Sequence, residues 1–358
     1  MTPLVEKKKT FPRILFILKL RHTSCGTSQH EIKSSGLLNS ATFVKDMLVD
    51  NGYEAKLVQV VDNNSIDREV TVYKPDVVII EALWVVPEKF EVLRKRHPNV
   101  EWVIRIHSEV PFLSNEGIAM DWINKYICQP NVFISLNSYK TYSDFVEYFN
   151  TVDTCGILTK KILFMPNYYP VKKRTKRPPI KFVPGGTLNI GCFGAVRPMK
   201  NHLVQAFAAV KFAEARSMKC RFHINAGRVE RGDEVLKNLR NFFVAFNGKH
   251  ELVEHDWLDR EEFLTLIRTM DFGLQVSLSE TFNIVAADFV SEGIPIVGSS
   301  EIDWLPSFYC AQPTSVEDII KTIERVVWYE KYFGWMDTAR KALKKYSKLS
   351  EKIWLDNL

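Results

Sequence analysis

The stretch LQVSLSETFNIVAADFVSEGIPIVGSS, residues 274–300, combines the signals of a strand, a turn, a short helix and a second strand. Gly293 stands where a helix commonly ends, and Pro295 follows it. Counting back from Gly293 predicts a helix that begins near Phe282, with Glu280 in the turn before it. A strand–helix–strand unit of this kind is the building block of a parallel α/β sheet.

Two acids, Glu280 and Asp288, lie eight positions apart in this segment. Glu280 could simply cap the helix, because a carboxylate near a helix N-terminus is electrostatically favoured. Asp288 could be an exposed helix position, yet the neighbouring Ala287 and Phe289 leave the helix little polar surface, so an acid there needs a partner or a cleft. The free amides of the first turn would point into that cleft; they belong to Phe282, Asn283, Ile284 and Val285.

Apolar runs of strand length alternate with helical patterns on both sides of this segment. Continuous Val- and Ile-rich runs favour parallel strands that are covered on both faces. Such runs fall at 13–20, 55–61, 76–83, 102–108, 132–138, 187–194 and 220–227. Helices are expected over 37–52, 201–217, 260–271 and 315–358, the last with Ser315 as its N-cap.

The chain has 358 residues, which is usually too long for one hydrophobic core. The segment 167–186 is rich in Pro, Gly and Lys/Arg, without a periodic apolar pattern, and this predicts an interdomain connection. We therefore expect an α/β chain with a Rossmann-like domain over 1–166, a linker over 167–186, a second Rossmann-like domain over 187–335 and a helix over 336–358. Ligands of such sheets bind at the carboxyl ends of strands, so the cleft between the domains is the expected site.

Composition is that of a soluble globular protein, with 46% apolar and 25% charged residues. The N-terminal basic residues before an apolar stretch raise the question of a signal peptide, but Arg13 and Lys19 interrupt or flank that stretch and no small-residue cleavage site follows, so we predict a buried strand. No apolar run is long enough to span a bilayer. Six cysteines without CxxC spacing argue against a zinc site and a disulfide framework, and favour a reducing, cytoplasmic setting.

The motif GAVRPMKNH, residues 194–202, places Gly194 at the end of a strand a few residues before a helix. A helix N-terminus favours an anion, and Arg197 and Lys200 add two positive charges that would suit a diphosphate. The alternative is a solvated loop with two surface cations. The dinucleotide fingerprint GxGxxG does not occur, and no metal-ligand cluster is evident, so neither a cofactor nor a metal is predicted.

The order S-x-x-E-x-F-x-(I/L)-V, an acid, then E-G-(I/V)-P-(I/V)-V resembles the signature of the large retaining GT-B glycosyltransferase group, of the glycosyltransferase family 4 type, in which two Glu residues are separated by seven positions. The Arg and Lys after a glycine-ended strand are also similar to that family. So are WLDREEFLTLI (257–267) and KILFMPN (161–167). The resemblance covers most of residues 161–300, more weakly 100–140, and the final helix.

The resemblance implies a GT-B fold: two Rossmann-like domains facing across a cleft, with the helix over 336–358 crossing back to the first domain, where Trp354 and Leu355 would pack. It also implies metal-independent sugar transfer from a nucleotide-diphosphate sugar to an acceptor, with retained anomeric configuration. The acceptor could be a glycan, a small molecule or a modified nucleic-acid base.

The resemblance also implies roles for single residues. Arg197 and Lys200 would contact the donor diphosphate, and Glu280 would hydrogen-bond the transferred sugar. The amides from Phe282 to Val285 would bind sugar or phosphate. Asp288 stands where the family's Glu binds the ribose and is one methylene shorter; Thr281 and Asn283 stand where Gly is usual, which leaves the donor's identity open.

Three sites in the first half complete the set of candidates. His107, at the carboxyl end of a strand in RIHSEVPF, is either a satisfied structural residue or, as the resemblance implies, a residue near the donor sugar. Gly26, with Ser24 and Thr27 and less strongly His30 and Lys33, lies in a loop expected to face the donor phosphates or the acceptor. Asn137 or Ser138 could face the acceptor, or cap the helix that follows.

Other functions are compatible with the same residues. A GT-B sugar-nucleotide epimerase or hydrolase would use similar phosphate contacts, and a catalytically inactive GT-B binding protein would keep the fold. The basic linker could track a nucleic-acid backbone or be merely solvated; its residues are Lys172, Lys173, Arg174, Lys176 and Arg177, beside Tyr168 and Tyr169. Peripheral membrane contact is left open.

Overall fold

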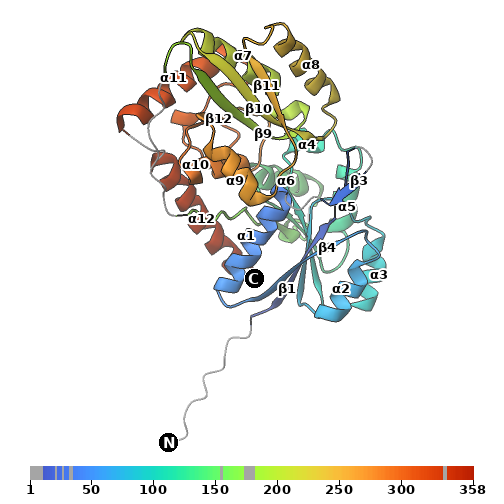
Figure 1. Ribbon diagram of the computed structural model, residues 1–358. Helices are drawn as coiled ribbons and strands as arrows, with labels where there is room; N and C mark the ends of the chain where they lie inside the picture. The colour runs from blue at the N-terminus through green and yellow to red at the C-terminus, as the bar shows by residue number, and fades with distance from the viewer. Residues whose placement is uncertain are drawn as a thin grey trace, which may run out of the picture.

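The computed structural model describes residues 11–20, 22–25, 28–31, 35–153, 156–172, 182–333 and 337–358. The chain forms two lobes, each built on a parallel sheet with helices on both faces (Figure 1). Candidate residues Gly26, Thr27 and Lys33, and most of the basic linker, lie outside the described residues, as do the side chains of Ser24 and His30.

The first sheet has six parallel strands in the order β4–β1–β5–β6–β7–β8. Their bounds are β1 (Arg13–Lys19), β4 (Glu54–Val60), β5 (Val77–Glu81), β6 (Glu101–Ile106), β7 (Val132–Leu136) and β8 (Ile162–Phe164). All residues of β5 are buried, as the continuous apolar runs predict. A short antiparallel pair, β2 (His22–Cys25) and β3 (Ser28–Glu31), follows β1.

Helices of the first lobe connect these strands. They are α1 (Gly36–Asp50), α2 (Ile66–Tyr73), α3 (Lys89–Arg96), α4 (Val110–Leu113), α5 (Ala119–Ile127) and α6 (Tyr139–Val152), followed by the 3-10 turn η1 (Thr159–Lys161). Helix α1 begins at the N-cap Ser35, whose Oγ accepts the Leu38 amide at 3.0 Å. This cap sets the point at which α1 faces the second lobe.

The second sheet has five parallel strands in the order β11–β10–β9–β12–β13. Their bounds are β9 (Thr187–Val196), β10 (Lys219–Val229), β11 (Glu251–His255), β12 (Phe272–Gln275) and β13 (Ile296–Gly298). The helices are η2 (Pro198–Lys200), α7 (His202–Glu214), α8 (Asp233–Val244), α9 (Arg260–Arg268), α10 (Ile284–Glu292), η3 (Ser307–Tyr309) and α11 (Val316–Phe333). Asp259 and Glu262 form a capping box that starts α9, and Ser315 accepts the Asp318 amide at the start of α11, as predicted.

Two glycines let α10 lie close against the second sheet. A Cβ atom at Gly273 would come within 2.7 Å of the Phe289 ring, and one at Gly191 within 2.9 Å of it. Gly293 ends α10 in the left-handed conformation, with φ of 73°, as predicted. Close packing and a defined end together fix where the N-terminus of α10 points.

Helix α12 (Asp337–Asn357) crosses back to the first lobe, where it lies beside α1 (Figure 1). Trp354 is fully buried there, and its Nε1 donates to the Pro166 carbonyl at 2.7 Å. The predicted return helix is thus confirmed. The predicted single helical stretch over 315–358 is instead divided into α11 and α12, on either side of residues outside the description. The domain bounds proposed above stay predictions. In the described ranges, every helix is too short or too polar to span a bilayer.

Candidate functional site

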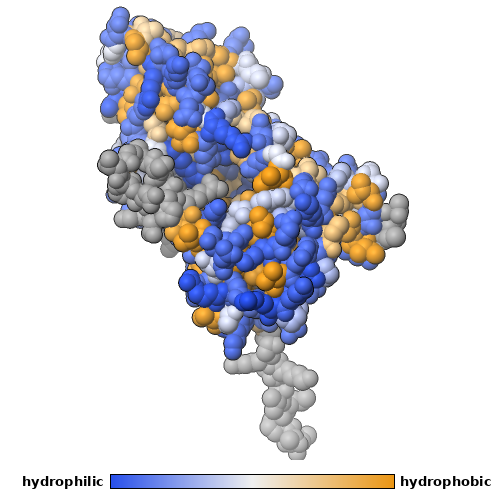
Figure 2. Space-filling model, turned by 90° about the vertical axis from the view of Figure 1, so that its right-hand side faces the viewer, coloured by the Kyte–Doolittle hydropathy of each residue, from blue (hydrophilic) through white to orange (hydrophobic). Residues whose placement is uncertain are grey.

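A cavity of about 630 Å³ lies between the two lobes. The surface narrows where the lobes meet, and hydrophobic residues are scattered among hydrophilic ones on the face shown in Figure 2. Residues at and just after the carboxyl ends of β6 and β9 line the cavity, from Ile106 to Glu109 and, apart from Val196, from Gly194 to Lys200. This is the edge at which parallel sheets hold their ligands.

Lys200 and Glu280 meet in this cavity as an ion pair between Nζ and Oε1. They come from η2 and from the turn before α10, and their side chains are 9% and 8% exposed. Gly194 lies beside the pair, since a Cβ atom there would be in ordinary contact with Cε of Lys200, at 3.6 Å. The structure therefore brings together three of the predicted residues.

Arg197 lies on the same wall of the cavity. Its guanidinium lies over the ring of Phe112, 5.0 Å from the centroid, and is 3.5 Å from Glu230. Two further arginines, which the sequence did not single out, also line the cavity. Arg228 lies over Trp257, and Arg231 donates to the Asn115 carbonyl at 2.5 Å. The second lobe thus presents four cations to the cavity, Arg197, Lys200, Arg228 and Arg231.

The start of α10 corrects one prediction. The helix begins at Ile284 rather than near Phe282, because Asn283 adopts φ of 57° and its Oδ1 accepts the Ala286 amide at 2.9 Å. The Phe282 side chain is 2% exposed, and its carbonyl accepts Nε1 of Trp304. Asn283, Ile284 and Val285 all line the cavity, and the free first-turn amides among them are those of Ile284 and Val285.

The N-termini of two helices, α1 and α10, line the same cavity. The sequence had pointed to that of α10 and to that of the helix after Lys200, but not to that of α1. Ser35, Gly36 and Leu37 come from α1, opposite Ile284 and Val285 of α10. Both macrodipoles present their positive ends there, which favours an anion between the lobes. The serine before the helix pattern was the available signal for the α1 cap.

Asp288 lines the cavity but is buried, so the exposed-position alternative is wrong. Its Oδ1 accepts the Tyr169 hydroxyl at 2.7 Å and Nη2 of Arg260 at 2.6 Å. Burial raises the pKa of Asp288, and the charge of Arg260 partly offsets this. The partner that the apolar helix required is therefore Arg260 together with Tyr169; contact with a ribose stays a prediction.

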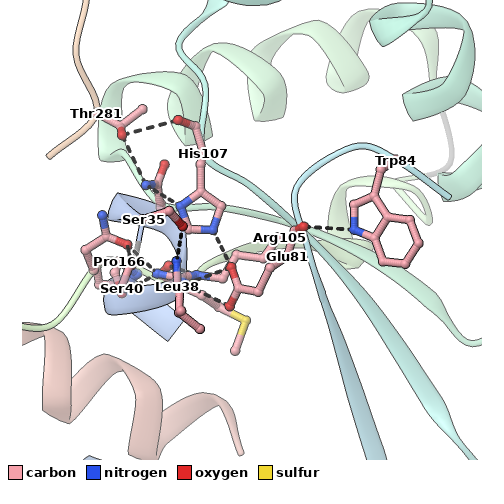
Figure 3. Close-up of polar contacts among 12 residues, drawn as sticks. Ser35, Leu38, Ser40, Glu81, Trp84, Arg105, His107, Pro166 and Thr281 are labelled. Atoms are coloured by element: carbon pink, nitrogen blue, oxygen red, sulfur yellow. Dashed lines mark hydrogen bonds and ion pairs between the residues drawn. The ribbon is translucent and has the colours of Figure 1, made fainter. Parts of the chain in front are cut away.

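His107 belongs to a buried polar network (Figure 3). Its Nε2 contacts Oε2 of Glu81, and its Nδ1 lies 3.3 Å from the Asn137 amide nitrogen. Burial lowers the pKa of His107, and Arg105 adds to this effect. Burial would raise the pKa of Glu81, but the charge of Arg105 and the hydrogen bonds with His107 and Arg105 outweigh it, and the pKa is lowered. The pair is thus a carboxylate beside a neutral imidazole.

Asn137 and Ser138 do not occur among the described residues that line the cavity. Ser138 does precede α6, but its side chain makes no capping hydrogen bond, so the predicted cap is only positional. Asn137 is 1% exposed and faces His107. An acceptor contact for either residue stays a prediction. In the described ranges, no group of three or more His, Cys, Asp or Glu side chains is arranged to hold a metal.

The two facing Rossmann-like sheets with a returning C-terminal helix define a GT-B fold, the predicted class. Solved structures of this fold superpose over nearly the whole chain. An E. coli trehalose-6-phosphate structure bound with UDP-2-fluoro glucose aligns with a TM-score of 0.66 at 12% identity, over 96% of this chain and 98% of that one. Sucrose-phosphate synthase from Thermosynechococcus elongatus gives 0.66 at 11%, with the same coverage.

A trehalose-6-phosphate synthase studied for glycosyl transfer with retention gives a TM-score of 0.59 at 12% identity, over 96% of this chain and 98% of that one. At such identities the likeness establishes the fold and no specific activity. No protein-family model matches the chain. No curated protein matches it either.

Proposed function

We propose that this chain is a retaining glycosyltransferase, which moves a sugar from a nucleotide-diphosphate sugar to an acceptor. The observation that carries the proposal is the ion pair of Lys200 with Glu280, in the cavity that the N-termini of α1 and α10 also line. A cation for a diphosphate and a carboxylate for sugar hydroxyls are held side by side at the cleft. The fold shared with a structure that holds UDP-2-fluoro glucose supports this assignment.

The cations would act on the leaving group. As the bond from the sugar to the diphosphate lengthens, negative charge grows on the phosphate oxygens, and preorganised donors lower the energy of that state. Arg197, Lys200 and the first-turn amides of Ile284 and Val285 are donors in the cavity, which Arg228 and Arg231 also line. Before a donor sugar arrives, Glu280 neutralises Lys200, so the ammonium is not left buried without a counter-charge.

Glu280 would then hold the sugar. A carboxylate accepts two or more hydroxyl hydrogen bonds, and these orient the anomeric carbon toward the cleft. The first lobe contributes the opposite wall, where Glu109, Asn115 and Glu116 line the cavity. The acceptor would enter between that wall and the sugar, on the face from which the diphosphate leaves.

The test uses purified protein, a panel of UDP, GDP, ADP and CMP sugars, and a thermal-shift readout. A donor that binds only the folded state raises the melting temperature, by the equivalent of about 2.7 kcal/mol at a hundredfold excess over its dissociation constant. Lys200→Ala should abolish this shift, while Lys348→Ala, an exposed residue of α12, should keep it.

Turnover is then measured with the donor so identified. Glu280→Gln should lower kcat by at least about a hundredfold and leave the circular-dichroism spectrum unchanged. NMR of the product should show the donor's anomeric configuration. The site assignment is wrong if Lys200→Ala keeps wild-type turnover at saturating donor. Release of free sugar without transfer would favour a hydrolase, and no shift with any donor a binding protein.

A further inference from the structure

Glu81 and Arg105 lie opposite each other on β5 and β6, and both are fully buried. Nη1 of Arg105 is 3.2 Å and 3.3 Å from the two Glu81 oxygens. The rest of the guanidinium donates to the carbonyls of Met165 and Pro166, both at 3.1 Å, and to Oδ1 of Asn167 at 2.6 Å. Burying such a pair gains little stability over apolar side chains, so its position beneath the cavity calls for another explanation.

Glu81 determines how His107 is protonated. An ionised carboxylate only accepts hydrogen bonds, so the His107 nitrogen that faces it, Nε2, must carry the proton. Nδ1 is then left as an acceptor. It meets the Asn137 amide nitrogen, which can only donate, at 3.3 Å. Donors and acceptors therefore match at both edges of the ring.

The same chain of contacts crosses the cleft. The Asn137 amide nitrogen also donates to Oγ1 of Thr281 at 3.1 Å, and the Thr281 hydroxyl lies 3.4 Å from the His107 carbonyl. Figure 3 shows Thr281 on one side of His107 and Glu81 on the other. Thr281 belongs to the second lobe and follows Glu280 directly in the chain. The contacts of Asn137 and His107 with Thr281 are named the cross-cleft latch.

We propose that Glu81 and Asn137 are positioning residues: Glu81 holds His107 in its Nε2–H tautomer, and Asn137 uses the free Nδ1 to join the lobes at Thr281, so that Glu280 is held against the first lobe. The role in sugar transfer rests on the proposed function. Loss of the carboxylate would free His107 to take the Nδ1–H tautomer. The N–H at Nδ1 of His107 would then face the N–H of the Asn137 amide. Neither group can accept a hydrogen bond, so the latch would open.

The tautomer is read directly by 15N NMR of the histidines, with His107 assigned from the spectrum of His107→Gln. Wild type should show a protonated Nε2 and an unprotonated Nδ1 at His107. Glu81→Gln should shift both nitrogens toward the mixed tautomers of a free imidazole. Because that variant leaves Arg105 without its counter-charge, it could fail to fold, and the latch is therefore tested separately.

Thr281→Val replaces the hydroxyl by a methyl group and should leave the His107 tautomer as in wild type. It should enlarge the radius of gyration in small-angle scattering and lower kcat/KM about fivefold, the fold-change of one neutral hydrogen bond. Thr281→Ser should restore wild-type values. Thr265→Val, on α9 outside the cavity, is the matched control.

An Nδ1–H tautomer in wild type, or a Thr281→Val variant that scatters like Thr265→Val, would overturn the proposal. The scattering and NMR measurements need no substrate. A wild-type protein that transfers no sugar therefore contradicts the proposed function, while an unchanged scattering profile contradicts the latch on its own.

Discussion

Gly36 and Ile284 bring the first turns of α1 and α10 into contact across the cleft: a Cβ atom at Gly36 would lie 3.3 Å from Cγ2 of Ile284. The two lobes are therefore in close contact where both helices present their free amides. Any side chain at position 36 must move the lobes apart or shift Ile284.

A larger side chain at Gly36 should weaken anion binding. Gly36→Val overpacks the contact by about 1–3 kcal/mol, and we expect the nucleoside diphosphate to bind roughly tenfold more weakly in isothermal titration. Ile284→Ala removes the opposing methyl group, so the double variant should bind more tightly than Gly36→Val alone. Equal affinities for the single and double variants would show that the contact does not control the site.

A side chain at Gly194 should strain the chain beside Lys200. Its φ of 115° is one that residues with a Cβ atom rarely adopt, and the cost is about 2 kcal/mol, or roughly 3 °C in melting temperature for a chain of 358 residues. We expect Gly194→Ala to show this loss in calorimetry. Gly117→Ala is the control, since nothing lies within 4 Å of the added atom and its φ is ordinary. Equal melting temperatures would contradict the strain.

Removing the charge of Asp288 should destabilise the fold. Asp288→Asn leaves Arg260 partly buried beside a neutral group, and we expect the free energy of unfolding to fall by about 3 kcal/mol in urea. The double-mutant cycle with Arg260→Leu measures the coupling. Since each single change removes the same ion pair, the double variant should lose less than the sum of the two. Strict additivity would mean that the pair contributes no coupling energy.

Stability in acid should depend on His202. The ring is fully buried, and in the described part of the chain its two nitrogens have no hydrogen-bond partner. Burial, then the charges of Lys200 and Arg197, lower the pKa of His202 to about 3 from 6.5. Between these values the unfolded chain binds the proton and the folded chain does not, so stability is lost as pH falls through this window.

His202→Leu should therefore show a smaller fall in melting temperature between pH 7.5 and pH 5 than wild type shows. At pH 7.5 it should be at least as stable, because two unpaired buried nitrogens are removed. An identical pH dependence in the two proteins would argue that His202 is not the group being protonated.

The alternation of strands and helices was predictable because continuous apolar runs leave few other arrangements: β5 falls inside its predicted run, and β6 begins one residue before its own. The start of α10 was misplaced by two residues. Asn283 is a favoured N-cap, and its left-handed backbone moves the first helical turn past Phe282. Glycine at Gly293 was a clearer signal, since its position at the helix end depends on local conformation alone.

The candidate site was predictable only in part. Lys200 and Glu280 each belong to a motif of recognisable spacing, Lys200 with Arg197 and Glu280 with Asp288. The pairing of Glu81 with Arg105 instead depends on strand register, which one sequence does not reveal. A signal was present, since an acid in the run DVVIIEAL and an arginine in WVIRIHS are charges inside buried strands and each needs a partner. Which partner each would find required the sheet order.

Trp354 has a consequence for how the chain is made. It packs against Phe16 of β1, with ring centroids 6.1 Å apart, and the Arg105 guanidinium lies 5.2 Å from its ring. The ribosome releases domains in order from the N-terminus, at about 5–20 residues per second. The first lobe is thus the earliest to emerge and the last to be finished, because its core lacks Trp354 until the whole second lobe has been synthesised. During that interval its unfilled apolar face is the part of the nascent chain most in need of a chaperone.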